Sequence, residues 1–331
     1  MPVELDRRSR SFSEKALPDK HYLWMRAEMK HFFTPKIFGS NYRFLFFMGC
    51  AMDSPMGIRA IMNQFLFREK ITVIGHESAQ FLPELENLTA RAGELIMAHY
   101  GSSLTVTTKP DGSPVTDVDH ISEEMITLAL SYLMPGVPVV GEEAISTGRE
   151  APPDISSGKF WLVDALDGTK EFLAGGQDFT VNIALVENAI PVLGVIYHPV
   201  SQMTYVGAGE GTAARVYPDG TRQAIEATLT DTSVRIVSSK SFGNEIQLAK
   251  YLAGRQIHEH RHRASSIKFC EVAEGRADLY PRFGPSREWD TAAGHAIVES
   301  AGGTVTTSAG QPLLYGKEGF QNSDFVVRGR R

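Results

Sequence analysis

Hydrophobic and polar residues follow a helical spacing first and then the spacing of short strands. Apolar residues in the segment 81–100 lie close to the i, i+3, i+4, i+7 positions of one helix face. A second helix is expected to follow the segment 115–119 and to continue to about Leu133. Apolar runs separated by short polar turns predict three further strands, at residues 179–186, 192–197 and 203–207. The mixture of both spacings predicts an α/β fold.

One stretch, residues 161–172, combines an apolar strand with two acids and a Gly-Thr pair. The apolar run ends at Val163 and Gly168 interrupts the pattern, so we expect Asp164 and Asp167 on the turn at the strand's carboxyl end. Ligand sites in open α/β sheets lie at this edge. Two carboxylates so close raise each other's pKa unless a cation neutralises both, and oxygen ligands favour Mg²⁺.

The residues after this turn can also bind an anion. If a helix starts at Thr169, its free N–H groups, the Thr169 hydroxyl and Lys170 form an anion site beside the metal. A metal next to an anion site indicates phosphate chemistry. The alternative is an Asx-type turn in which Asp164 only caps a helix and Asp167 is solvated.

Three other stretches place acids at the end of a strand or the start of a helix. Asp119 lies in the first turn of the second helix and can point back towards the central turn, and one interpretation of Asp117 is that it caps this helix. Glu142 follows a short apolar strand, and Asp290 is expected in the first turn of a helix that begins near Glu288. Each acid can be explained as a cap or a solvated residue. They become functional if the fold brings them to the central turn.

The chain has 331 residues, of which 42% are hydrophobic and 22% charged. This composition is typical of a globular protein large enough for two packed subdomains, and we place the polar connection between them at 217–232. A net charge of -6 argues against nucleic acid as the main partner. Cys50 and Cys270 form neither a disulfide framework nor a zinc spacing, which favours a reducing cytoplasm.

Residues 1–75 differ from the rest. The first 70 residues hold 12 Lys and Arg, 7 Asp and Glu, and 12 aromatic residues, and the apolar run 44–52 is half the roughly 18 residues that span a bilayer. Three interpretations compete: a basic aromatic extension that touches a membrane or a partner, a poorly ordered leader, or translated sequence upstream of a start at Met62. The lack of periodicity favours the last two. We expect a cytoplasmic protein, with peripheral association at the inner membrane as the alternative. No transmembrane segment indicates membrane association.

Three histidines alternate along a strand-like segment, at His258, His260 and His262, with Arg261 and Arg263 between and beside them. Alternating His and Arg residues are more typical of an exposed strand than of a metal site. We therefore expect a surface strand here.

Taken together, these stretches resemble the lithium-sensitive, Mg²⁺-dependent phosphomonoesterases of the inositol monophosphatase superfamily, over roughly residues 80–325. The family's Gly-Glu-Glu, Trp-x-x-Asp-Pro-x-Asp-Gly-Thr and Trp-Asp-x-Ala-Ala-Gly motifs are found here at 141–143, 161–169 and 289–294. Ala165 replaces the usual proline, which removes a rigid turn residue but no ligand. The resemblance implies a layered αβαβα sandwich with a metal-binding subdomain at 76–225 and a C-terminal subdomain at 226–331.

Within this superfamily, three segments look like those of the bacterial CysQ-type 3′(2′),5′-bisphosphate nucleotidases: Asp-Gly-Thr-Lys-Glu-Phe, Ser-Ser-x-Lys-Phe-Cys and Leu-Tyr-Pro-Arg-Phe-Gly-Pro. Such an enzyme would convert 3′-phosphoadenosine 5′-phosphate, a by-product of sulfate assimilation, to AMP. One alternative is an inositol or sugar phosphatase of the same fold. Another is a regulatory protein that has lost catalysis and docks through its basic N-terminal segment.

The resemblance also implies roles for particular residues. Two or three Mg²⁺ ions per site would be held by Glu142, Asp164, the Leu166 carbonyl, Asp167 and Asp290. The catalytic residues would be Asp119, Glu142 and Thr169, with Thr169 hydrogen-bonded to Asp119 and orienting the attacking water. The substrate, a small nucleotide bisphosphate, would contact Gly168, Thr169, Lys170, Ser266, Lys268, Tyr280, Arg282 and Asp290. Of these, Ser266, Lys268 and Arg282 would bind the second phosphate, and Tyr280 the base or ribose.

Overall fold

The structure, a computed structural model, describes residues 78–102, 104–148, 151–228, 233–240 and 244–330. The predictions for residues 1–75, including the leader, the start at Met62 and membrane contact, lie outside these residues. Within the described ranges, no helix is both long enough and apolar enough to cross a membrane.

The outer helix layer consists of α5 (Leu82–His99), preceded by the 3₁₀ turn η1 (Ser78–Phe81), and α6 (Asp117–Leu133). Leucines at the predicted spacing form the buried face of α5. Asp117 is not the cap of α6. Thr116 is the N-cap and forms a capping box with Asp119, whose carboxylate accepts the Thr116 N–H at 2.8 Å.

The first sheet has seven strands in the order β3-β4-β5-β6-β7-β8-β9. β3 is parallel to β4, and every other pair is antiparallel. The strands are β3 (Val139–Gly141), β4 (Lys159–Asp167), β5 (Thr180–Glu187), β6 (Ile190–His198), β7 (Met203–Gly207), β8 (Ala214–Val216) and β9 (Arg222–Ala224). The three strands expected at 179–186, 192–197 and 203–207 are confirmed as β5, β6 and β7. However, β9 falls within the segment expected to be only a connection, because it pairs with β8 at the sheet edge.

The central strand continues further than predicted. We expected it to end at Val163, but β4 continues through both acids because β5 stays paired with it: Asp164 pairs with Asn182, and Asp167 with Thr180. Three residues on β4 therefore span two on β5, which is a β-bulge. Residues three apart on a regular strand face opposite sides, so the extra residue brings both acids to the same side.

Short elements join these strands. The hairpin of β1 (Val106–Thr108) and β2 (Pro114–Thr116) leads into α6. The helix α7 (Glu142–Ser146) follows β3 directly, and α8 (Thr169–Leu173) follows β4 after Gly168. Both acidic motifs therefore lie where a strand gives way to a short helix.

The second sheet has five strands in the order β11-β10-β12-β14-β13. They are β10 (Val234–Ser239), β11 (Ile257–Arg263), β12 (Leu279–Arg282), β13 (Thr304–Thr307) and β14 (Phe325–Arg328). The remaining helical elements are α9 (Glu245–Leu252), α10 (Ile267–Ala273), α11 (Ala292–Ser300) and the 3₁₀ turn η2 (Glu318–Phe320).

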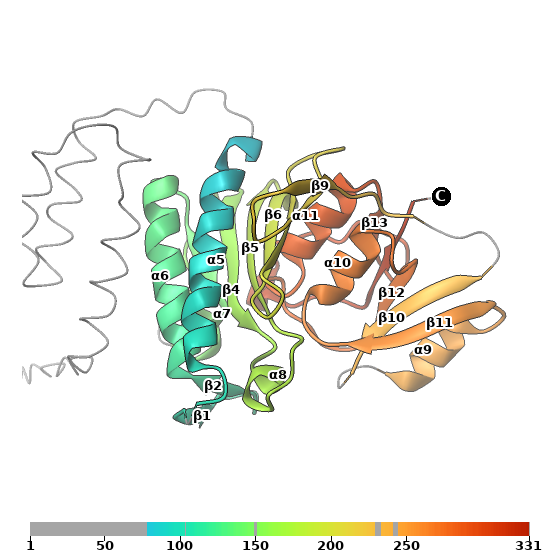
Figure 1. The fold of residues 1–331 in the computed structure, drawn as a ribbon, viewed down its shortest axis with the longest axis horizontal. Helices are drawn as coiled ribbons and strands as arrows, with labels where there is room; N and C mark the ends of the chain where they lie inside the picture. The colour runs from blue at the N-terminus through green and yellow to red at the C-terminus, as the bar shows by residue number, and fades with distance from the viewer. Residues whose placement is uncertain (1–77, 103, 149–150, 229–232, 241–243, 331) are drawn as a thin grey trace, which may run out of the picture. The chain divides into compact units, whose positions relative to one another are not determined.

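The layers are visible in Figure 1: α5 and α6, the seven-stranded sheet, α10 and α11, the five-stranded sheet, and finally α9. This arrangement confirms the predicted αβαβα fold. One hydrophobic core joins the two sheets through the helices between them, with Phe160 and Ile196 on one side and Phe269, Trp289 and Phe325 among its other members. The boundary that we propose near residue 225 therefore separates two sheets that share a core.

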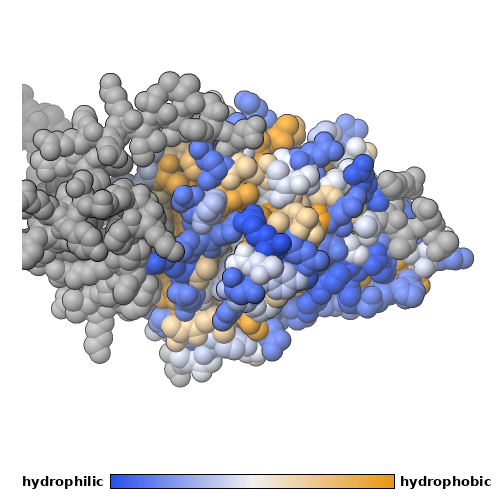
Figure 2. Space-filling view, turned by 45° about the horizontal axis from the view of Figure 1, so that its top comes forward, coloured by the Kyte–Doolittle hydropathy of each residue, from blue (hydrophilic) through white to orange (hydrophobic). Residues whose placement is uncertain are grey.

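The histidine-rich strand is β11, an edge strand whose three histidines are exposed. Figure 2 shows mainly hydrophilic atoms at the end of the molecule that carries β10, β11 and α9. The Ser238 hydroxyl lies 2.9 Å from His260 Nε2 and 3.1 Å from His262 Nδ1. The exposed position of β11 at the sheet edge confirms the expected surface strand.

Candidate active site

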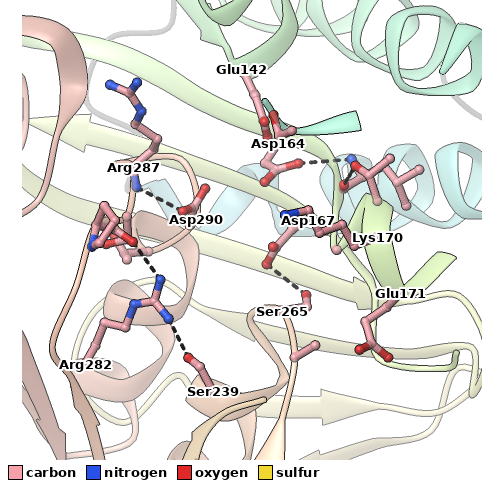
Figure 3. A pocket seen from close by; sticks show the side chains of 18 of the residues that line it. Glu142, Asp164, Asp167, Lys170, Glu171, Ser239, Ser265, Arg282, Arg287 and Asp290 are labelled. Atoms are coloured by element: carbon pink, nitrogen blue, oxygen red, sulfur yellow. Dashed lines mark hydrogen bonds between the residues drawn. The ribbon is translucent and has the colours of Figure 1, made fainter. Parts of the chain in front are cut away.

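A pocket of about 510 Å³ lies where β4 ends and where residues before α10 and α11 approach it (Figure 3). Its walls include residues of the seven-stranded sheet, such as Asp164, and residues of the five-stranded sheet, such as Arg282. Its acidic residues are Asp111, Glu142, Asp164, Asp167, Glu171 and Asp290. Its basic residues are Lys109, Lys170, Lys240, Lys268, Arg282 and Arg287. The pocket thus combines groups that attract a cation with groups that attract an anion.

Three carboxylates from separate elements converge in this pocket. Glu142, Asp164 and Asp290 each offer an oxygen, and these oxygens all lie within 4.8 Å of one another (Figure 3). The expected place of Asp290 in the first turn of a helix was wrong. α11 begins only at Ala292, and Asp290 lies in the preceding turn, where its carboxylate accepts the backbone N–H of Arg287 at 2.9 Å.

The electrostatics of this cluster favour a bound cation. Burial raises the pKa of Asp164 well above its ordinary value, and the charges of Glu142, Asp167 and Asp290 raise it further. Burial also raises the pKa of Asp290, with added repulsion from Asp167 and Glu142. A hard divalent cation would relieve this repulsion and accept these oxygen ligands, so the donor set fits Mg²⁺.

The alternative of an Asx turn is partly correct. The Asp164 carboxylate accepts the Leu166 N–H at 3.1 Å, as in such a turn. However, Asp164 is a strand residue with 2% of its surface exposed, not a helix cap. The turn therefore orients a buried acid within the cluster.

Asp167 lies next to the three-carboxylate cluster and is held from the other side of the pocket. Its Oδ2 accepts the Ser265 hydroxyl at 2.8 Å, the Ser266 N–H at 2.7 Å and the Ser266 hydroxyl at 2.9 Å. Asn182 adds a longer contact at 3.3 Å. These bonds fix the carboxylate through one oxygen.

Thr169 and Asp119 form the predicted hydrogen bond. The Thr169 hydroxyl donates to Asp119 Oδ1 at 2.9 Å and lies 3.2 Å from the Leu166 carbonyl oxygen. Gly168, at φ 103°, makes the turn from β4 into α8, and a Cβ there would lie 2.9 Å from the Asp178 carbonyl oxygen. Asp119 is buried, and burial raises the pKa of its carboxyl group although Thr116 and Thr169 donate to it.

Of the three residues predicted to bind a second phosphate, two line the pocket and one does not. Lys268 and Arg282 line the pocket, and the Arg282 guanidinium donates to the Ser239 hydroxyl and the Pro285 carbonyl, both at 2.6 Å. Burial lowers the pKa of Lys268 to about 8. Ser266 is not among the lining residues, and its hydroxyl lies 2.9 Å from Asp167 Oδ2 and 2.8 Å from the Asp290 carbonyl oxygen.

Three further residues line the same pocket: Tyr280, Lys170 and Ser265. Tyr280 is buried with its ring 5.3 Å from the Lys268 ammonium, and burial raises the pKa of its hydroxyl to about 12. Lys170 also lines the pocket, as does Ser265 in the position where we expected Ser266. Ser265 has a left-handed backbone, at φ 56°, which directs its hydroxyl towards Asp167.

Sequence reasoning missed two buried residues beside Glu142. The Lys109 ammonium lies 2.6 Å from Glu142 Oε1 and 2.7 Å from Glu143 Oε1. Burial alone would lower the pKa of Lys109, but the two acids raise it overall. Glu123 on α6 accepts backbone N–H groups of α7. Neither residue has a sequence signal, because the partners lie 20 to 34 positions away.

The chain is similar to known proteins in sequence and in structure. The sequence profile of the inositol monophosphatase family matches residues 78–326. The 3′(2′),5′-bisphosphate nucleotidase CysQ of Escherichia coli K12 is 41% identical over 249 residues, which cover 74% of this chain and 98% of that protein. The enzyme of the same name from Buchnera aphidicola is 40% identical over 253 residues, covering 75% and 93%.

A solved structure shows the same arrangement of the chain. The crystal structure of CysQ from Bacteroides thetaiotaomicron, a bacterial member of the inositol monophosphatase family, matches with a TM-score of 0.60 and 34% identity. The match covers 74% of this chain and 95% of that chain.

Proposed function

Because the chain belongs to the inositol monophosphatase family, we propose that it is a Mg²⁺-dependent 3′(2′),5′-bisphosphate nucleotidase. It would hydrolyse 3′(2′)-phosphoadenosine 5′-phosphate to AMP and phosphate. The observation that carries this proposal is the cluster of Glu142, Asp164 and Asp290 in a pocket that also holds the Thr169–Asp119 pair. The names of the relatives supply the substrate class.

We assign two or three Mg²⁺ ions to this site. Their ligands would be Glu142, Asp164, the Leu166 carbonyl, Asp167 and Asp290. When bound, the ions would neutralise the carboxylates and act as Lewis acids toward the phosphate oxygens and the attacking water. The oxygen-only donors and the mutual repulsion of the buried acids support this assignment.

The protein's own groups would orient the water and accept its proton. The Thr169 hydroxyl donates to Asp119, which leaves its oxygen lone pairs facing away from the carboxylate to accept a hydrogen bond from water. As the water oxygen forms its bond to phosphorus, the bond from phosphorus to the 3′ or 2′ ribose oxygen would break. The water's proton would pass to Thr169 and the Thr169 proton to Asp119, while the leaving ribose oxygen would take a proton from solvent to become the hydroxyl of AMP. The free N–H groups at the start of α8, with Lys170, would hold the phosphate oxygens. This route needs no covalent enzyme intermediate.

The second phosphate would lie among the cations on the opposite wall. Arg282 and Lys268 face this part of the pocket, and Ser239 and Pro285 fix the guanidinium. Ser266, assigned earlier to this phosphate, would act only through Asp167, whereas Ser265 is at the pocket surface. Tyr280 would contact the base or ribose.

The partners of such an enzyme follow from its substrate. A small nucleotide bisphosphate is the expected ligand, and the net charge of -6 supports a small molecule rather than nucleic acid. We propose the cytoplasm as its location, where this substrate and reduced cysteines would both occur.

The test compares phosphate release from 3′-phosphoadenosine 5′-phosphate and from inositol 1-phosphate, each with Mg²⁺ or EDTA. We expect the nucleotide to be preferred by kcat/KM, and Asp167→Asn and EDTA to remove activity. Glu171→Gln, which changes an acid on the pocket rim outside the proposed ligand set, serves as a matched control and should retain activity. Preference for inositol 1-phosphate would keep the site but refute the substrate assignment. A lack of turnover on both substrates would favour a regulatory protein.

A further inference from the structure

The short helix that carries Glu142 is capped by another helix. α7 has five residues, and its N-cap, Gly141, has no side chain to accept the free N–H groups of the first turn. The carboxylate of Glu123, on α6, accepts them instead. Its Oε2 lies 2.7 Å from the Glu143 N–H nitrogen and its Oε1 2.8 Å from that of Ala144.

Glu123 occupies the space that a side chain at position 141 would need. A Cβ built on Gly141 would lie 2.4 Å from the carboxyl carbon of Glu123. The backbone of Gly141, at φ -99° and ψ 148°, is open to any residue. Glycine is therefore required here by the carboxylate of Glu123 and not by the backbone conformation.

These contacts fix the position of Glu142. A helix of five residues is not stable by itself, so its place depends on contacts outside it. Lys109 holds the Glu142 side chain at 2.6 Å, and Glu123 holds the backbone on either side of Glu143. With 5% of its surface exposed, Glu123 has little access to water, so its loss would leave two N–H groups without an acceptor.

We propose that Glu123 is a positioning residue that places the Glu142 carboxylate in the three-carboxylate cluster and thereby sets the affinity for Mg²⁺. The proposal rests on the proposed function only for the identity of the metal. Partners that orient a metal ligand commonly change metal affinity about 10–100-fold when they are replaced. Glu123 acts through the backbone of α7 and does not itself touch the cluster.

The first test is calorimetric titration of the EDTA-treated protein with Mg²⁺, without substrate. Glu123→Gln keeps the shape of the side chain but turns an N–H donor towards a backbone N–H, so we expect the Kd for Mg²⁺ to rise about 10-fold or more. Glu124→Gln, on the exposed face of the same helix, is the matched control and should bind as wild type does. At saturating Mg²⁺, the KM for the nucleotide should change less than twofold in Glu123→Gln.

The second test asks whether one substitution changes Mg²⁺ affinity in opposite directions in two backgrounds. In the wild-type background Gly141→Ser should weaken Mg²⁺ binding, because the new Cβ displaces the Glu123 carboxylate. In a Glu123→Ala background the space is empty and serine is a favoured N-cap, so the same change should recover part of the lost affinity. If Glu123 only stabilises the fold, Gly141→Ser in the Glu123→Ala background should raise the melting temperature without recovering Mg²⁺ affinity.

The outcomes separate this proposal from the proposed function. Equal Mg²⁺ affinity in wild type, Glu123→Gln and Glu123→Ala would overturn it, as would equal harm from Gly141→Ser in both backgrounds. A wild-type protein that releases no phosphate but shows the expected pattern of Mg²⁺ affinities would refute the nucleotidase activity and leave this inference intact.

Discussion

The hydrogen bond between Thr169 and Asp119 gives the sharpest test of the catalytic arrangement. Asp119 Oδ2 accepts hydrogen bonds from both the N–H and the hydroxyl of Thr116. In an asparagine at this position, the carbonyl oxygen would therefore face Thr116, because only it can accept these two bonds. The amide of Asp119→Asn would then face Thr169 and donate to its hydroxyl oxygen. Thr169 could no longer pass a proton to residue 119, and the lone pair that should accept from water would be occupied.

We expect Asp119→Asn to lower kcat about 10²–10⁴-fold, the usual contribution of a positioned acid or base. This corresponds to about 3–5 kcal/mol of activation free energy. The Thr116 capping contacts survive, so the free energy of unfolding should change by no more than about 1 kcal/mol. Steady-state phosphate release at saturating Mg²⁺, with a thermal melt of the same sample, measures both quantities.

Asp117→Asn is the matched control, because Asp117 is an exposed acid in the same turn of α6. Thr169→Val should resemble Asp119→Asn, and the double variant should be no slower than the worse single variant, since the two residues act as one unit. A kcat for Asp119→Asn within threefold of wild type would refute the proposed proton path.

Three further predictions concern the metal, the turn and the second phosphate. Without metal, thermal stability should fall as pH rises from about 4 towards 8. The folded-state pKa values of Asp164 and Asp290 lie above the unfolded value, so the unfolded chain releases these protons at lower pH than the folded protein does. Melting curves in which Mg²⁺ does not reduce this pH dependence would contradict the role of the cluster. Gly168→Ala should destabilise the protein by about 2–4 kcal/mol, since its Cβ would meet a backbone carbonyl at φ 103°. Gly175→Ala, where the added Cβ meets open space, should cost about 1–2 kcal/mol, and equal denaturant midpoints for the two variants would count against the steric argument. Arg282→Gln should raise the KM for the nucleotide about 10-fold or more and leave that for inositol 1-phosphate unchanged, whereas equal effects on both would remove Arg282 from the second-phosphate site.

The fold and the acidic motifs could be predicted because their signals are local. Helical spacing in α5 and apolar runs in the first sheet are properties of neighbouring residues, and each acidic motif directly follows a strand or precedes a helix. The bulge in β4 could not be predicted, since it depends on how β5 pairs with Asp164 and Asp167. We therefore expected a turn where the chain continues as a strand.

The contacts that orient the acids were not predictable for a similar reason. Lys109 and Glu123 are ordinary helix or turn residues until α7 is packed against them. Both serine hydroxyls contact Asp167 Oδ2, yet only Ser265, whose φ is 56°, lines the pocket, and the sequence carries no signal for that backbone conformation. The sequence pattern identifies the residue types near a site, whereas tertiary pairing decides which of their atoms face it.

Asp167 links the proposed metal site to the opposite wall of the pocket. Asp167 belongs to the first sheet, yet its Oδ2 is held by Ser265 and the next residue, which precede α10. The segment before α10 also contacts Asp178, a buried residue just before β5. The Asp178 carboxylate accepts hydrogen bonds from the Arg263 guanidinium at 3.0 Å and from the Ala264 N–H at 3.1 Å. A shift of α10 against the first sheet would therefore move a proposed metal ligand and the wall of the phosphate pocket together. Metal affinity and substrate affinity should accordingly respond together to changes at this junction, in contrast to changes at Glu123, which lies behind α7 and should affect the metal alone.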